Sequence, residues 1–157
     1  MALLADPAAG QQSAVSPIER RISGTWALVE WYFQGQVLTP PVADGRLVYG
    51  DGQVVATFHR NLGTEAYDRY AYGSYSLTQS RWTYRYARTV EITRKDGGST
   101  VVQGTGEPVS FAIRFEGPKL IFDDQKSDRR FVFESDQLTY FEKGQVLRKW
   151  RRFKGNG

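Results

Sequence analysis

Tyrosine and arginine side chains are concentrated in two neighbouring segments, residues 67–78 and 82–94. Both segments are rich in aromatic and β-branched residues, so we expect strands, in which successive side chains point to opposite faces. Strict alternation gives the second segment one face made of Trp82, Tyr84, Tyr86, Arg88, Val90 and Ile92. It gives the first segment one face made of Tyr67, Arg69, Ala71, Gly73, Tyr75 and Leu77, and another that contains Asp68, Tyr70 and Tyr72.

Rings with hydroxyl tips beside guanidinium groups suit a cavity that holds a mostly apolar molecule and fixes one or two of its polar atoms. We therefore predict ligand contacts by the phenols of Tyr84 and Tyr86 and by one guanidinium group, that of Arg85 or of Arg114. The apolar contacts of the same prediction are Phe111 and Phe133. The alternative is that tyrosine and arginine only pair across neighbouring strands on the outer surface.

Two residues are candidates for proton transfer. His59 ends a strand-like segment and is followed by Arg60 and Asn61, which predicts a position at the end of a strand, near a cavity mouth. As a general base it needs a substrate proton within hydrogen-bond distance. Tyr72 is the second candidate, as a hydrogen-bond donor to a carbonyl group. The alternative for His59 is a surface residue with no part in chemistry.

Composition excludes several kinds of chemistry. The chain has no cysteine, which excludes disulfides, thiolate catalysis and cysteine-ligated metals, and its one histidine excludes a multi-histidine zinc site. The glycines at 97–98 and 104–106 are not followed by the lysine and helix of a phosphate loop. We therefore expect neither a metal nor a cofactor.

Charge says little about partners. The net charge is +4, but five basic residues lie together in residues 148–154, and the rest of the chain is near neutral. A nucleic-acid-binding protein spreads its positive charge over a face, so we expect no nucleic acid partner. No segment is apolar enough to cross a bilayer, and the oligomeric state stays undetermined. Residues 1–15 lack the features of a secretory signal, which favours the cytoplasm, or export if a signal has been removed.

The elements that position these residues are mostly short strands. Residues 1–15 are predicted to be a flexible tail, and residues 16–154 a single domain. Ser16, Pro17 and Glu19 form a capping box that predicts one or two helical turns before Gly24. Period-two patterns with turn residues between them then predict strands over residues 25–33, 46–49, 53–59, 67–78, 82–94, 100–103, 109–115, 120–123, 130–134, 138–141 and 145–153.

Strands joined by hairpin-length links favour an antiparallel meander, and closing such a sheet removes its two long edges. We therefore predict an all-β fold, an antiparallel up-and-down β-barrel of eight to ten strands with a short N-terminal helical turn. A β-sandwich is the alternative, because strand periodicity does not distinguish a closed sheet from two packed sheets.

Three short motifs resemble the bacterial and fungal lipocalin-like domain family. They are the Gly-x-Trp opening at residues 24–29, a strand that leads to a glycine turn at residues 45–52, and the Ala-Tyr-Gly-Ser-Tyr-Ser sequence of residues 71–76, which looks like the family's Tyr-x-Gly-x-Tyr segment. The resemblance extends over residues 20–153. It implies a lipocalin-like barrel in which a basic side chain of the last strand packs over Trp26, with Arg148 or Arg151 as candidates for that role. Alternation places Arg148, Trp150 and Arg152 on one side of the strand and does not decide which arginine meets Trp26.

Two functions follow from this interpretation. The first is binding of a small, largely apolar or amphiphilic molecule with a carbonyl, hydroxyl or carboxylate group inside the barrel. The second is a cofactor-free enzyme, a cyclase, isomerase or lyase, that acts on such a molecule in the same cavity, as lipocalin-like barrels are known to do. An interaction module that uses the outer surface is the third.

Overall fold

The structure is a computed structural model that describes residues 16–124 and 126–155. One short helix, α1 (Pro17–Ile22), precedes a long series of strands. The strands are β1 (Gly24–Phe33), β2 (Gln36–Leu38), β3 (Ala43–Gly50), β4 (Gln53–Asn61), β5 (Glu65–Leu77), β6 (Arg81–Lys95), β7 (Gly98–Gly104), β8 (Val109–Glu116), β9 (Lys119–Asp124), β10 (Arg129–Glu134), β11 (Gln137–Glu142) and β12 (Gln145–Arg152).

Ten of these strands close into an antiparallel β-barrel, which confirms the predicted fold class. Neighbouring strands follow the order β12-β11-β10-β9-β8-β6-β5-β4-β3-β1, and pairing of β12 with β1 closes the ring. The β1–β12 register places Trp26 opposite Arg152 and Leu28 opposite Trp150. The short strand β2 pairs with the end of β1 and is not one of the ten strands of the ring. Sequence patterning did not predict this strand.

The helix α1 closes one end of the barrel. The Ser16 hydroxyl accepts a hydrogen bond from the Glu19 backbone N–H at 3.0 Å, which confirms the capping box. Ile18 and Ile22 are buried against the core, and the Ile22 carbonyl accepts a hydrogen bond from the Trp26 indole at 2.9 Å. The helix is therefore held to the barrel by both apolar packing and a buried hydrogen bond.

At this closed end Arg152 packs over Trp26, with its guanidinium carbon 4.2 Å from the ring centroid. The prediction that Arg148 or Arg151 takes this role is wrong. Side chains of β12 alternate between the two faces of the sheet, so Arg151 faces outward. Arg148 points inward, but it pairs with Trp31, at the other end of β1 from Trp26. A basic residue of the last strand does cover Trp26, as the resemblance implied.

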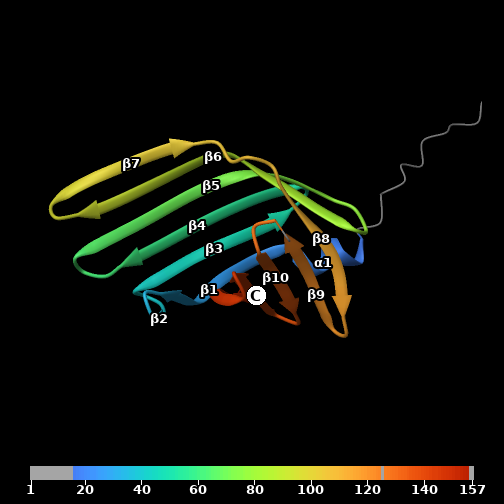
Figure 1. Ribbon diagram of the computed structural model, residues 1–157. Helices are drawn as coiled ribbons and strands as arrows, with labels where there is room; N and C mark the ends of the chain where they lie inside the picture. Colours follow the sequence, from blue (N-terminus) through green and yellow to red (C-terminus); the bar gives the residue numbers. More distant parts are fainter. Residues whose placement is uncertain (1–15, 125, 156–157) are drawn as a thin grey trace, which may run out of the picture.

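The long strands form a curved leaf that extends beyond the ring. β5 and β6 pair along their full length, and β7 pairs with the second half of β6 (Figure 1, upper left). The short C-terminal strands, orange to red, lie beside this leaf. The mouth of the barrel therefore has one tall wall, formed by β5 and β6, and a low wall on the side of β10 to β12.

A β-bulge in β6 changes which residues face inward. Tyr86 pairs with Gly73 and Arg88 pairs with Tyr72, so Ala87 is the extra residue. A side chain at Gly73 would meet the Arg85 carbonyl at 1.9 Å, so only glycine fits this close approach of β5 to β6. The predicted shared face of six β6 residues is therefore wrong beyond the bulge, because Arg88 and Val90 point outward while Trp82, Tyr84 and Tyr86 point inward.

None of the helices in residues 16–124 and 126–155 combines the length and apolar character that a bilayer-crossing helix requires.

Candidate functional site

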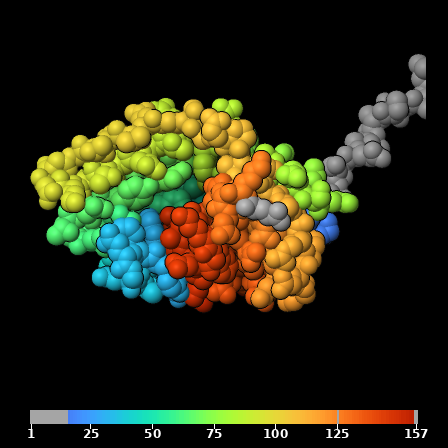
Figure 2. All heavy atoms as spheres, viewed as in Figure 1, coloured from blue at the N-terminus to red at the C-terminus, as the bar shows by residue number. Residues whose placement is uncertain are grey.

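A cavity of about 220 Å³ lies inside the barrel on the side away from α1. All of its walls come from inward-pointing strand residues. They are Leu47, Tyr49, Val54, Phe58, Tyr67, Arg69, Trp82, Tyr84, Tyr86, Arg129, Phe131, Tyr140, Glu142, Arg148 and Trp150. The surface is hollowed where the long strands meet the red C-terminal strands (Figure 2).

Aromatic rings form the apolar part of this cavity. The Trp82 ring lies 4.8 Å from Tyr84 and 5.6 Å from Phe131, measured between centroids. On the opposite side Phe58 packs edge-on against Trp150 at 5.4 Å. Because these rings pack against one another, they hold the apolar walls of the cavity in place without a ligand.

Phenol groups supply neutral hydrogen-bonding groups to the same space. Burial raises the pKa of Tyr84, Tyr86 and Tyr140 above the ordinary value for tyrosine. These hydroxyls therefore stay protonated at neutral pH and are able to donate. Tyr140 donates to the Glu142 carboxylate at 2.7 Å, whereas no side-chain hydrogen bond of Tyr86 occurs among the described residues.

Three arginines reach the cavity, and two of them have carboxylate partners. Arg69 pairs with Glu91 at 3.1 Å, and Arg129 pairs with Asp124 at 3.1 Å. Arg148 differs, because in residues 16–124 and 126–155 it has neither an ion pair nor a hydrogen bond from its side chain, and its Nε atom is buried. Its guanidinium carbon instead lies 4.6 Å from the ring centroids of both Trp31 and Phe58.

Of the predicted ligand contacts, the structure places Tyr84 and Tyr86 in the cavity. Phe111 is fully buried behind the wall, where it stacks on Tyr84 at a centroid distance of 6.0 Å. Phe133 is 1% exposed and packs against Trp26 at the closed end. Both phenylalanines belong to the core and do not line the cavity.

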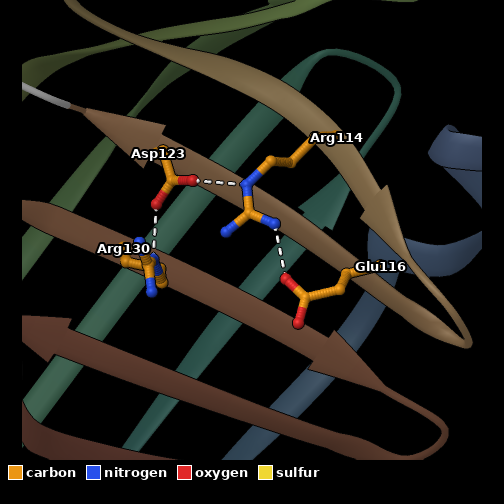
Figure 3. Close-up of polar contacts among 4 residues, drawn as sticks. All are labelled: Arg114, Glu116, Asp123 and Arg130. Carbon is orange, nitrogen blue, oxygen red and sulfur yellow. Dashed lines mark hydrogen bonds and ion pairs between the residues drawn. The ribbon is translucent and has the colours of Figure 1, made fainter.

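The two arginines predicted as anchors point away from the cavity. Arg85 lies between Tyr84 and Tyr86 on β6, so alternation directs it outward, where its Nε donates to the Gly106 carbonyl at 3.1 Å. Arg114 lies on the outer face of β8, paired with Glu116 at 2.6 Å and with Asp123 at 2.9 Å (Figure 3). Asp123 also pairs with Arg130 at 2.5 Å, so Arg114 belongs to a surface ion-pair network.

His59 and Tyr72, the candidates for proton transfer, also lie on the outer face. His59 is exposed, and its Nδ1 lies 2.5 Å from the Asp68 carboxylate, which Arg94 contacts from the other side at 2.5 Å. Burial opposes the charge of Asp68, but these two partners hold the pKa of its carboxyl below the usual value. Tyr72 is 54% exposed, in a row with Val55 and Arg88. The structure does not bring either residue to the cavity.

The sequence interpretation missed most of the cavity's polar groups. It placed Tyr67 and Arg69 correctly on one face of a strand without assigning them to the site, and it gave Arg148, with Arg151, as a candidate for the closed end. The signal for Arg148 was the alternation of Arg148, Trp150 and Arg152 on β12. Tyr140, Glu142 and Arg129 lie on short hairpins whose inward face the pattern alone does not define.

Among the described residues, no group of three or more histidine, aspartate or glutamate side chains is arranged to hold a metal ion. Comparison of this chain with protein-family models, with curated proteins and with solved structures found no match in any of the three. The class of the protein is therefore defined by its fold, a closed antiparallel ten-strand β-barrel with a helix at one end. The lipocalin-like resemblance stays a prediction.

Proposed function

We propose that the barrel interior binds a small, largely apolar molecule that carries a carbonyl, hydroxyl or carboxylate group. The observation that carries this proposal is the cavity of about 220 Å³ whose walls combine aromatic rings with neutral phenols and guanidinium groups. Burial of ligand surface against the rings supplies affinity, at roughly 25 cal/mol per Å² before ordering costs. The polar groups fix the ligand's orientation.

Binding is favoured over the alternative of a cofactor-free enzyme by the position of the acid–base groups. His59 and Tyr72 lie outside the barrel, where no cavity ligand reaches them. Among the described residues that line the cavity, Glu142 is the one carboxylate, and its oxygen already accepts the Tyr140 hydroxyl. Catalysis in this cavity would therefore depend on a group at its exposed rim.

Native mass spectrometry of the protein purified from its own host tests the proposal. We expect a bound small molecule in the wild type and its loss in Tyr86→Trp, because the larger ring fills part of the cavity. Tyr72→Trp is the matched control on the outer face and retains the molecule. An occupant that stays bound in Tyr86→Trp, or an empty wild type that also takes up no aromatic ligand in titrations, contradicts the proposal.

A further inference from the structure

Arg148 indicates which polar group a ligand of this cavity would carry. It is the cavity's one arginine without a carboxylate partner among the described residues, since Arg69 and Arg129 are paired with Glu91 and Asp124. Burial lowers the pKa of the Arg148 guanidinium, but an arginine side chain stays charged at neutral pH in proteins. The protein therefore holds a positive charge without an ion-pair partner, among the described residues, against the rings of Trp31 and Phe58.

Desolvation of a guanidinium at a partly buried position costs free energy unless an anion pairs with it. Cation–π contacts with the two rings offset part of this desolvation cost, but they give none of the N–H donors an acceptor. The buried Nε of Arg148 has no acceptor, and the buried Nε of Arg69, on the facing wall, has none either. A planar carboxylate matches the fork of N–H groups that arginine presents.

The groups around Arg148 favour a ligand with a single negative charge. Tyr67 and Tyr86 line the cavity with Arg148, and burial raises the pKa of both phenols, so they remain neutral donors. Glu142 lies at the same wall but beyond ion-pair distance of Arg148, and it accepts the Tyr140 hydroxyl. Its charge disfavours a second anionic group on the ligand at the mouth.

The size of the cavity limits the rest of the molecule. Cavities of about 150 Å³ in other proteins hold benzene, and the cavity here has about 220 Å³. One aromatic ring with a short substituent therefore fits, and a long acyl chain exceeds this volume. The ring contacts available for it come from Trp82, Tyr84 and Phe131.

We propose that Arg148 is the anchor of a site for small aromatic monocarboxylates, with the carboxylate on its guanidinium and the ring against the Trp82 wall. This inference rests on the proposed interior binding function and specifies its ligand class.

The test compares acids with their uncharged counterparts. Benzoate, 3-phenylpropanoate, cinnamate and 4-hydroxycinnamate are each titrated alongside the corresponding primary amide, by ligand-detected NMR, against four proteins. These are the wild type, Arg148→Gln, Arg148→Lys and Arg151→Gln. Arg151 lies on the outward face of the same strand, so its variant removes the same charge from the chain without touching the cavity.

In the wild type we expect at least one acid to bind about tenfold or more tightly than its amide. Arg148→Gln reduces this preference to less than about threefold, Arg148→Lys retains part of it because the charge remains without the fork, and Arg151→Gln leaves it unchanged. Melting temperatures are measured on all four proteins, so that a loss of binding caused by unfolding is recognised.

Two results overturn the inference in different ways. If acids and amides bind equally in the wild type, and Tyr86→Trp abolishes both, the interior site stands and the carboxylate anchor is wrong. If neither acids nor amides bind to the wild type, the proposed interior site itself fails for aromatic ligands, and the anchor with it.

Discussion

The two ends of the barrel each place an arginine of β12 over a tryptophan of β1, but only one of these arginines is satisfied. At the closed end Arg152 donates hydrogen bonds to the backbone carbonyls of Ser23 and Arg21, the second at 2.6 Å, and lies 3.6 Å from the Asp136 carboxylate. At the open end Arg148 stacks on Trp31 at 4.6 Å without any of these partners.

The difference separates the structural role of Arg152 from the binding role that we propose for Arg148. Both arginines point inward from the same strand, so the strand pattern treats them alike. Arg152 donates to backbone carbonyls at the junction of α1 and β1, where the last carbonyls of a helix lack partners within the helix. Arg148 has no backbone to complete, and its donors face a cavity. The same residue type therefore closes the barrel at one end and, at the other, lies without a hydrogen-bond acceptor among the described residues, where we propose that it binds an anion.

The largest expected effect is at the closed end. Trp26 is 0% exposed and joins α1, Arg152 and Phe133. Trp26→Ala is expected to lower the free energy of unfolding by about 3–5 kcal/mol, because a large ring leaves a cavity that the barrel fills only in part. Urea unfolding followed by circular dichroism measures this change. A midpoint equal to that of the wild type would contradict the assigned role of Trp26.

Arg152→Met tests the satisfied arginine. The substitution keeps a flexible apolar stem over Trp26 but leaves the carbonyls of Ser23 and Arg21 without their donors. We expect a loss of about 2–3 kcal/mol in the free energy of unfolding, typical of hydrogen bonds from a charged group. Chemical denaturation at pH 7 measures it, with Arg151→Met as the exposed control. A loss below that of the control would place Arg152 outside the closure.

Arg148→Met is the matched change at the open end, and its expected effect on stability has the opposite sign or is absent. Removing an unpartnered guanidinium from among aromatic rings relieves its desolvation, so the free energy of unfolding is expected to stay within about 0.5 kcal/mol of the wild type or to rise by about 1 kcal/mol. The comparison between the two arginines breaks if Arg148→Met destabilises the protein as much as Arg152→Met does.

Glu142→Gln gives the smallest expected effect. The change removes the one negative charge among the described cavity-lining residues while keeping an acceptor for the Tyr140 hydroxyl. Because Glu142 is exposed, we expect aromatic carboxylates to bind only about two- to fivefold more tightly, with the amides unaffected. Titrations at low and high salt measure this gain, which decreases as ionic strength rises. Weaker binding of the acids would assign Glu142 a direct contact with the ligand.

Much of the fold could be predicted from the sequence because local signals and the global architecture agree. The capping box at Ser16, the period-two segments and the turn glycines each define one element, and ten strands with hairpin links close most simply into a barrel. Tyr84 and Tyr86 were placed by alternation alone. The same rule could have excluded Arg85, which lies between them, and it separates Arg114 from Phe111, three residues earlier on β8.

The rest of the site depends on features that alternation does not contain. The bulge at Ala87 depends on the close approach of Gly73 to the Arg85 carbonyl, a contact between two strands. The assignment of Arg148 or Arg152 to Trp26 depends on the β1–β12 register, which is set when the ring closes. His59 was predicted to end its strand, but β4 continues to Asn61, and whether His59 faces inward depends on the register of β4 with β3 and β5.

The extra residue in β6 also divides that strand into two lengths with opposite phase. Up to Tyr86 the even-numbered side chains form the barrel wall, and beyond Ala87 the odd-numbered ones, Thr89 and Glu91, continue the concave surface toward β7. One inserted residue thus places Arg88 and Arg94 on the outer face and Glu91 on the concave face, where it pairs with Arg69. Which charged side chains of β6 face the concave surface is therefore set by the number of residues in the strand as well as by their identity.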